Sequence, residues 1–461
     1  MQRLFAIAWL TWKAALRFRL FLVIAVLLLA SVVGLPLLIE DDGTARGFTQ
    51  ILLTYTLSVI TALLGLSTLW LACGTLARDI EECQMQVVAV KPIARWQIWL
   101  GKWLGIVSLN AALLAISGGS VFALLQYRAT RLPPEQQHIL RNEVLVARGS
   151  VREPSFEKRI EEDTDRQMKA MLQKTAVPVG DLKLLRQQIN ERIKGEYQLV
   201  PPGGYRPWRI DLGLAKNSLH DRPLYVRIKF NTANYSSSGT FLALWQVGDP
   251  ESPRVWRNEE PMSLAPDTFH EFEIPPNLFD EKGILTILFV NPNNAAMLFP
   301  LNEGMEVLYR ESGFGVNFIR GVGVIFCWMA LLAALGLTAA SFLSFPVAAF
   351  FSLSLLMMAL SSGTLANVVK EGTLTGYDAE HGYTSSPVDA VVVPVFRAAL
   401  QVINLAKDFS PIDSLSTGRS ITWWQLLQAF SQIVLLLGGI IGAVGVLIFN
   451  RRELATAQGN Q

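Results

Sequence analysis

The residues that could carry catalysis are few and widely spaced. A loop that cradles nucleotide phosphates has the pattern GxxxxGK[ST], and the stretch GKWLG at 101–105 is too short for it and lies at the start of a predicted membrane helix. The sequence HGYTSS at 381–386 places a histidine near serines, but no Ser/His/Asp or metal-ligand pattern extends it. The sequence therefore predicts a chain that is not itself an enzyme.

Histidines and cysteines give no sign of a metal or redox centre. The histidines are scattered: His138, His220, His270 and His381. The cysteines, Cys73, Cys83 and Cys327, form no CxxC pattern and fall in predicted membrane or cytoplasmic segments. We expect no cofactor bound to this chain. The longest polar region, which has no cysteine, must fold on its own core rather than on a disulfide framework.

The composition predicts an integral membrane protein. Of 461 residues, 51% are hydrophobic and 17% charged, which is too apolar for an ordinary soluble chain. A helix needs roughly 20 mostly apolar residues to cross the hydrocarbon layer. Six segments meet this requirement: 20–39, 51–76, 103–125, 316–345, 347–362 and 426–449. The fifth is the weakest, because it is short and starts just after Pro346.

Basic residues predict the orientation. Lysine and arginine near membrane ends are retained on the cytoplasmic side. They gather in 3–19, 78–102 and 451–452, whereas 40–42 is acidic. We therefore expect a multi-pass protein of the cell (inner) membrane with both termini in the cytoplasm. Apolar residues recur at helical spacing between Leu4 and Phe18, which favours an interfacial N-terminal helix over a frayed tail.

The region between the third and fourth spans predicts an extracytoplasmic insert in two parts. Residues 128–204 are rich in charge and helix formers and predict a helical stalk, whereas 205–315 alternate with period two, as in LYVRIKF, and predict an antiparallel β-sandwich. Three tryptophans of this sandwich are candidates for stacking on a glycan or peptide, although core packing is the commoner role. They are Trp208, Trp245 and Trp256.

The remaining parts of the chain complete the predicted domains. Residues 1–127 would hold the interfacial helix and the first three spans, with a cytoplasmic segment at 78–99. Residues 316–461 would hold the last three spans and an outer segment at 363–425. We expect the apolar stretch near Asp389, Pro394 and Arg397 to be a surface or partly re-entrant helix rather than a seventh span, because a further crossing would move the C-terminus outside.

The segment between the second and third spans is more elaborate than a connecting turn. Its acidic residues suit a helix N-terminus, Pro92 breaks the chain, and the next helix runs straight into the third span. Gly101 and Gly105 form a small-xxx-small face for helix packing, a spacing that Gly438 and Gly442 repeat in the last span. These features favour a cytoplasmic surface built for a partner.

In these features the sequence resembles the ABC-2 type permeases, the membrane subunits of ATP-binding-cassette exporters. The likeness lies in RDIEE at 78–82 leading through VKPIARWQIWLGKWLG into the third span, and in FSPIDSLSTG at 409–418 followed by the last span and FNRREL. The resemblance implies a separate cytoplasmic ATPase subunit that holds ATP and magnesium, and a second permease subunit, identical or related. The large outer insert departs from a minimal permease.

The resemblance also implies that 78–99 docks on the ATPase. The residues expected there are Asp79, Glu81, Glu82, Val87, Val88, Pro92, Ile93 and Arg95. Two alternatives stay open: a membrane-anchored binding or scaffolding protein, and a mechanotransmitter that uses ATP to move its outer domain without transport. Beyond the ATPase and the second permease, we expect contacts with membrane lipid and with an extracytoplasmic protein or glycan, but none with nucleic acid.

Overall fold

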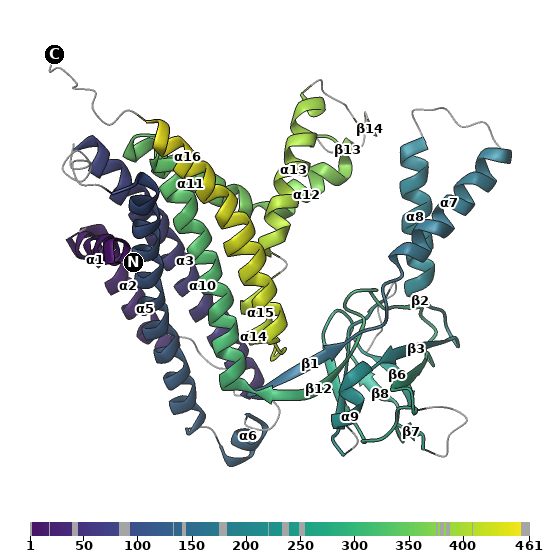
Figure 1. The fold of residues 1–461 in the computed structure, drawn as a ribbon. Coiled ribbons are helices and arrows are strands. Elements are labelled where there is room, and N and C mark those ends of the chain that lie inside the picture. Colours follow the sequence, from purple (N-terminus) through teal and green to yellow (C-terminus); the bar gives the residue numbers. More distant parts are fainter. Residues whose placement is uncertain are drawn as a thin grey trace. The chain divides into compact units, whose positions relative to one another are not determined.

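The computed structural model describes residues 2–17, 19–38, 45–82, 93–131, 133–140, 144–174, 182–219, 221–232, 239–248, 254–374, 377–378, 382–383, 388–407 and 409–452. The chain divides into two compact units. One unit comprises Met1–Ala147 and Ser312–Gln461 and is almost entirely helical; the other comprises Arg148–Glu311 and holds most of the strands (Figure 1).

The helical unit is a bundle of long helices. Its helices are α1 (Gln2–Arg17), α2 (Arg19–Leu38), α3 (Ala45–Glu81), α5 (Arg95–Ala129), α6 (Pro134–Ile139), α10 (Phe314–Ala340), α11 (Phe345–Leu360), α12 (Ser362–Glu371), α13 (Asp389–Lys407), α14 (Pro411–Ser416), α15 (Trp423–Ala429), a π-helix (Phe430–Gly438) and α16 (Gly439–Arg451). The short strands β13 (Tyr377–Asp378) and β14 (Gly382–Tyr383) pair between α12 and α13.

Five helical segments of the described chain are long and apolar enough to cross a membrane. They are Thr49–Glu81, Arg95–Ala129, Phe314–Ala340, Asp389–Ser416 and Trp423–Arg451. Two bent pairs would raise the number to seven: Gln2–Arg17 with Phe21–Leu35, bent by 77°, and Phe345–Leu360 with Ser362–Lys370, bent by 62°. The prediction of a mainly helical chain with several helices long and apolar enough to span a membrane is confirmed. The predicted first and fifth spans, 20–39 and 347–362, each correspond to one helix of a bent pair. The 363–425 segment contains a helical stretch of spanning length, Asp389–Ser416.

The bend between α11 and α12 lies level with the middle of α10. Lys407 Nζ donates to Ser362 Oγ at 2.9 Å, and the neighbouring Ala406 carbonyl accepts from Nε1 of Trp328, which is midway along α10, at 3.3 Å. At 1.5 Å per residue, the 16 residues of α11 cover about 24 Å, less than the roughly 30 Å of a hydrocarbon core. Helix α11 alone is therefore too short to cross.

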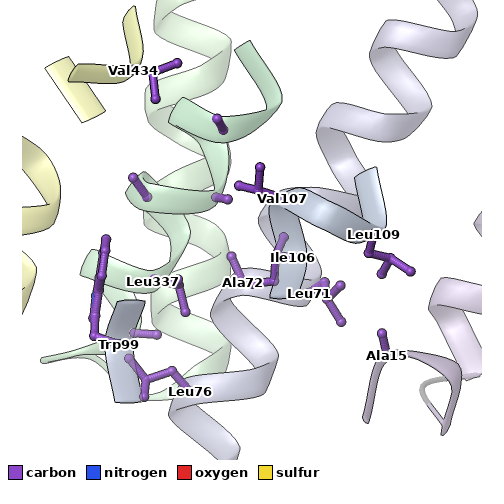
Figure 2. Packing of buried hydrophobic residues seen from close by; sticks show 14 of the residues in the cluster. Ala15, Leu71, Ala72, Leu76, Trp99, Ile106, Val107, Leu109, Leu337 and Val434 are labelled. Atoms are coloured by element: carbon purple, nitrogen blue, oxygen red, sulfur yellow. The ribbon is translucent and has the colours of Figure 1, made fainter. Parts of the chain in front are cut away.

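The core of the bundle is closely packed because small residues face neighbouring helices. A Cβ atom added to Gly336 of α10 would lie 2.7 Å from Ala72 of α3, so these two helices approach closely. Figure 2 shows part of this core, with Ala72, Trp99 and Leu337 among the buried side chains. Such close approach strengthens van der Waals packing, the main attraction between helices in lipid.

The second unit is a β-sandwich. Its four-stranded sheet has the order β1 (Val146–Val151), β12 (Met305–Gly313), β4 (Leu224–Ile228), β9 (His270–Ile274). The larger sheet contains β3 (Tyr205–Asp211), β10 (Ile284–Val290), β6 (Phe241–Val247), β7 (Trp256–Arg257) and β8 (Met262–Leu264). A third, small sheet joins β2 (Leu199–Val200), β11 (Met297–Leu298) and β5 (Asn231–Thr232). The strand pairs β3–β10, β6–β10, β4–β12 and β4–β9 are antiparallel, which confirms the predicted antiparallel arrangement.

Side chains that alternate between buried and partly exposed along the strands form the core of the sandwich. Along β4, Leu224, Val226 and Ile228 are fully buried while the residues between them are partly exposed, and β6 and β10 behave likewise. Their buried side chains join one apolar cluster. The compact unit begins before the predicted sandwich boundary at 205, because β1 pairs with β12 and β2 pairs with β11.

The predicted stalk helices form a hairpin within this unit. Helix α7 (Glu157–Lys174) packs against α8 (Leu182–Gln198) through a small apolar cluster that includes Ile160, Ile189 and Ile193. Their remaining faces are charged and exposed, as expected for helices with few apolar residues.

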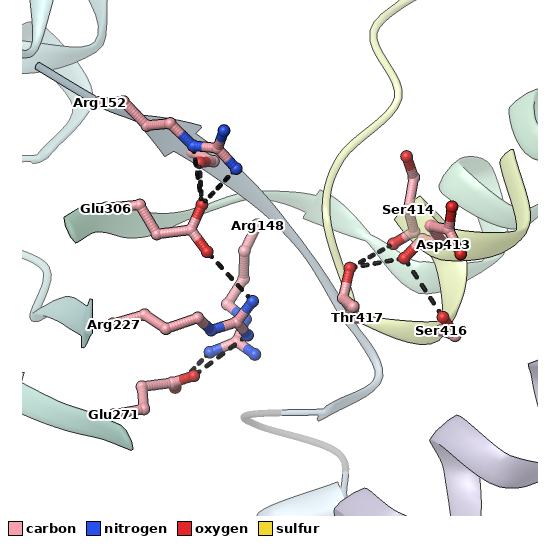
Figure 3. A network of polar contacts seen from close by, with 10 residues as sticks. Arg148, Arg152, Arg227, Glu271, Glu306, Asp413, Ser414, Ser416 and Thr417 are labelled. Atoms are coloured by element: carbon pink, nitrogen blue, oxygen red, sulfur yellow. Dashed lines mark hydrogen bonds and ion pairs between the residues drawn. The ribbon is translucent and has the colours of Figure 1, made fainter. Parts of the chain in front are cut away.

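A row of charged residues crosses the four-stranded sheet on the face opposite the apolar core. Arg227 of β4 lies directly opposite Glu306 of β12 and Glu271 of β9, and its guanidinium nitrogens lie 3.2 Å from a carboxylate oxygen of each (Figure 3). Arg148 Nη1 donates to Glu271 at 2.5 Å, and Arg152 lies 3.2 Å from Glu306. The two carboxylates are nearly inaccessible, so this network is part of the interior of the unit.

Candidate functional site

Side chains of 78–82 and 93–102 lie where five helices begin or end. Helices α3, α10 and α16 end there, and α5 and α11 begin there. These side chains, together with that of Arg452 directly after α16, bind backbone groups and charges at these helix ends. We call this cluster the helix junction and define it by Arg78, Asp79, Glu81, Arg95, Lys102 and Arg452.

Arg95 ties the start of α5 to the end of α16. Its Nη1 donates to the carbonyls of Phe449, Asn450 and Arg452 at 2.9, 2.9 and 2.7 Å. The last carbonyls of a helix have no partner within the helix and carry the negative end of its dipole, so a guanidinium is well suited to bind them. A movement of α5 at Arg95 would therefore displace the end of α16.

Arg452 and Glu81 extend the same arrangement to two further helices. Arg452 Nη1 donates to the carbonyls of Ala340 and Ser341, at the end of α10, at 3.4 and 3.0 Å. Glu81, at the end of α3, accepts a hydrogen bond of 2.8 Å from the backbone N–H of Phe345, the first residue of α11. Arg78 lies over the Phe345 ring, with 4.7 Å between the guanidinium carbon and the ring centroid.

Lys102 and Asp79 join α5 to α3 inside the junction. Lys102 Nζ lies 2.5 Å from Asp79 Oδ2 and donates to the Thr75 carbonyl at 2.8 Å. The lysine side chain is 8% exposed and that of the aspartate 34%. A charge in so apolar a setting needs its partner, because desolvation otherwise strongly disfavours it. This ion pair fixes the relative position of α3 and α5.

Apolar contacts strengthen the junction beside these polar ones. Trp99 is buried, and a Cβ atom added to Gly442 of α16 would lie 2.8 Å from its ring. Ile93 is half-buried and packs on the core of the bundle. The predicted interface residue Ile93 thus contacts the chain's own helices.

The seven predicted docking residues other than Ile93 fall into three groups. Asp79, Glu81 and Arg95 bind groups of their own chain, so their charges form the junction rather than a free rim. Glu82 is exposed. The other three, Val87, Val88 and Pro92, lie outside the described residues.

Three of the four glycines predicted for helix packing lie at close contacts, and one does not. A Cβ at Gly101 would lie 2.8 Å from Ile7 of α1, and one at Gly105 would lie 2.7 Å from Thr11, so their partner is the N-terminal helix. Gly442 faces Trp99. Gly438 meets only a carbonyl of its own helix, at 3.3 Å, and its assignment to packing between helices is not supported by the structure.

The tryptophans predicted as stacking candidates are placed differently from one another. Trp208 and Trp245 are each 2% exposed and pack against Phe299, whose ring centroid lies 5.2 and 6.3 Å away. Their faces are covered by the sandwich core, so neither offers a face to a ligand. Trp256 is half-buried and stacks on Phe272, with centroids 5.8 Å apart.

Sequence reasoning missed the roles of Lys102 and Arg452. Lys102 stands among buried residues of α5, and a charge inside an apolar helical run is a recognisable signal of a buried partner. Arg452 follows a helix, where basic residues bind terminal carbonyls. Neither signal identifies the helix that is bound. Asp79 lies 23 positions from Lys102 in the sequence, and Ala340 lies 112 positions from Arg452.

As far as the structure describes it, the junction holds no cluster of side chains that could bind a metal ion. Within the described ranges, no group of three His, Cys, Asp or Glu side chains could hold a metal ion. None of the family models, curated proteins and solved structures compared with the chain matches it. The bonds of the junction hold five helix ends together, so a displacement of one helix end would be transmitted to the others.

Proposed function

We propose that the chain is the permease subunit of an ABC-2 type exporter, driven by a separate cytoplasmic ATPase. The proposal rests on the sequence resemblance and is supported by one structural observation, the helix junction. In this proposal the junction faces the cytoplasm, and the 78–99 segment receives the movement of the ATPase. The exposed Glu82 and the neighbouring Val87, Val88 and Pro92 remain the candidates for direct contact.

The proposed mechanism follows from the bonds of the junction. ATP-driven closure of the ATPases displaces the segment, and Arg95 and Arg452 carry the displacement to α16 and α10. Glu81 and the Lys102–Asp79 pair carry it to α11 and α5. Because these bonds reach five helices, a small local displacement can move much of the bundle together. A path between two such bundles, in a dimer with an identical or related chain, would then be exposed alternately to the two sides.

A second candidate function, mechanotransmission, is favoured by one feature of the chain. Strand β12 ends at Gly313 and α10 begins at Phe314, so no linker separates the sandwich strand from the helix that ends in the junction. A displacement of α10 could therefore act on the strand without a substrate crossing. Under this alternative the extracytoplasmic unit works on a protein or glycan outside the membrane.

We expect the chain purified from its native membrane in mild detergent to carry a stoichiometric ATPase. The measurement is mass spectrometry of the purified complex, looking for a subunit that contains GxxxxGK[ST]. Adding ATP to inverted vesicles then separates transport from mechanotransmission, because only transport accumulates a solute. A chain that purifies without any nucleotide-binding subunit, under conditions that retain other complexes, would favour the anchored binding protein instead.

A further inference from the structure

Arg320, a buried arginine in α10, forms no ion pair with any residue that the structure describes. Arg320 lies in the second turn of the helix and is 8% exposed. Its Nη1 donates to the Ile421 carbonyl at 2.9 Å, and its Nε has no hydrogen-bond partner. In the part of the chain that the structure describes, no ion pair joins it to a carboxylate. Burial of an unpaired cation is costly, so such a residue indicates an anionic ligand.

The backbone beside Arg320 is held firmly. One helical turn before it, the Asn317 side chain donates to the Arg419 carbonyl at 2.8 Å and accepts from the Ile421 N–H at 2.7 Å. These bonds fix residues 419–421 against α10. The Ser420 hydroxyl in this segment is also buried without a hydrogen-bond partner. Arg320 thus donates to the residue that follows Ser420, and each of the two side chains has a buried donor group without a partner.

An exposed tryptophan covers the guanidinium. The Trp423 ring centroid lies 4.7 Å from the Arg320 guanidinium carbon, and Trp423 is 59% exposed. Trp424 beside it is 65% exposed. Tryptophans of this kind favour the headgroup level of a bilayer. Basic pockets between membrane helices bind phosphate headgroups, and a guanidinium matches the geometry of phosphate oxygens.

We propose that Arg320, Ser420 and Trp423 form a binding site for the phosphodiester of an anionic lipid headgroup. Trp423 turns aside to admit the phosphate, which then receives hydrogen bonds from Arg320 and Ser420. The site lies at the N-terminal end of α10, and α10 ends in the junction 20 residues later. The proposal does not depend on the transport function.

The test is lipid binding by the full chain in detergent, measured by native mass spectrometry with phosphatidylglycerol, phosphatidylcholine and glycerol phosphate. We expect phosphatidylglycerol to bind at least tenfold more weakly to Arg320→Gln than to the unaltered chain. Arg451→Gln, which removes an exposed charge at the end of α16, should change binding by less than twofold. Arg320→Lys keeps the charge and should show an intermediate affinity.

The measurement distinguishes a lipid headgroup from a soluble phosphate ester as the ligand of the site. Equal phosphatidylglycerol binding by Arg320→Gln and the unaltered chain would overturn the site. Glycerol phosphate binding that competes with the lipid and is lost in Arg320→Gln would support the anion site but overturn the lipid as its ligand. If Arg320→Gln does not elute as a single folded species, the comparison rests on Arg320→Lys, and unchanged affinity in that variant contradicts the proposal.

Discussion

Replacing Glu306 by alanine should destabilise the 148–311 unit by about 3–5 kcal/mol. The Glu306 side chain is 3% exposed and binds Arg227, Arg152 and the Ser150 hydroxyl. Its removal leaves three arginines of the network with one carboxylate, Glu271, and the nearly inaccessible Arg227 loses one of its two partners. A buried charge that loses its partner cannot regain hydration, so the folded state bears the full cost.

Hydrogen–deuterium exchange of the full chain measures this effect at the amides of β4 and β12. Exchange in Glu306→Ala should be faster by about two to three orders of magnitude, because each tenfold change corresponds to about 1.4 kcal/mol. The control is Glu196→Ala in α8, where an exposed pair with Arg192 at 3.3 Å should contribute about 0–1 kcal/mol. Equal protection in the two variants would show that the buried charge row does not stabilise the unit.

Replacing Asp79 by alanine should have a comparable effect on the helical unit. Lys102 would keep only the Thr75 carbonyl as a partner while its side chain stays buried. We expect a loss of about 3 kcal/mol, and therefore a lower thermal midpoint in detergent and a lower yield of folded protein. The measurement is thermal unfolding of purified Asp79→Ala in one detergent.

The double variant Asp79→Asn with Lys102→Met removes both charges at similar volume and serves as the control. It should recover most of the lost stability, because replacing a buried ion pair by neutral groups is often neutral or stabilising. A double variant as unstable as Asp79→Ala would show that the lost stability does not come from an uncompensated lysine.

Much of the fold could be predicted because local periodicity determines it. The alternation of LYVRIKF predicts β4 with Leu224, Val226 and Ile228 inside, and this is where they lie. Long apolar runs predict the membrane class. The route of the chain between α11 and α14 could not be predicted in this way, because length and hydropathy do not distinguish a bent pair from a span. Contacts between distant residues, such as Lys407 with Ser362, are needed.

The contacts of the candidate site could not be predicted from the sequence. The expectation that the acidic residues of 78–99 lie at a helix N-terminus is wrong, because α3 continues to Glu81, so Asp79 and Glu81 lie at its C-terminal end, where they and Arg95 bind distant groups. From the sequence alone we expect these charged residues to lie on a surface that contacts a partner, because acidic and basic residues near a helix end are usually solvated. Only the folded chain reveals that free helix ends lie within reach of them. The same limit applies to Trp208, whose burial depends on strands far apart in sequence.

If the helix junction couples a separate ATPase to the long apolar helices, Arg95→Ala should uncouple them, which ATP hydrolysis by the reconstituted complex measures. Arg95→Ala removes the hydrogen bonds from α5 to the carbonyls of Phe449, Asn450 and Arg452 at the end of α16 and leaves Glu82 unaltered. This variant should retain the ATPase subunit, but its hydrolysis rate should fall to that of the free ATPase. The control Arg192→Ala, on an exposed helix of the other unit, should hydrolyse ATP as the unaltered complex does. If the Arg95→Ala complex hydrolyses ATP at the unaltered rate and still couples hydrolysis to activity, the junction does not couple the ATPase to the helices.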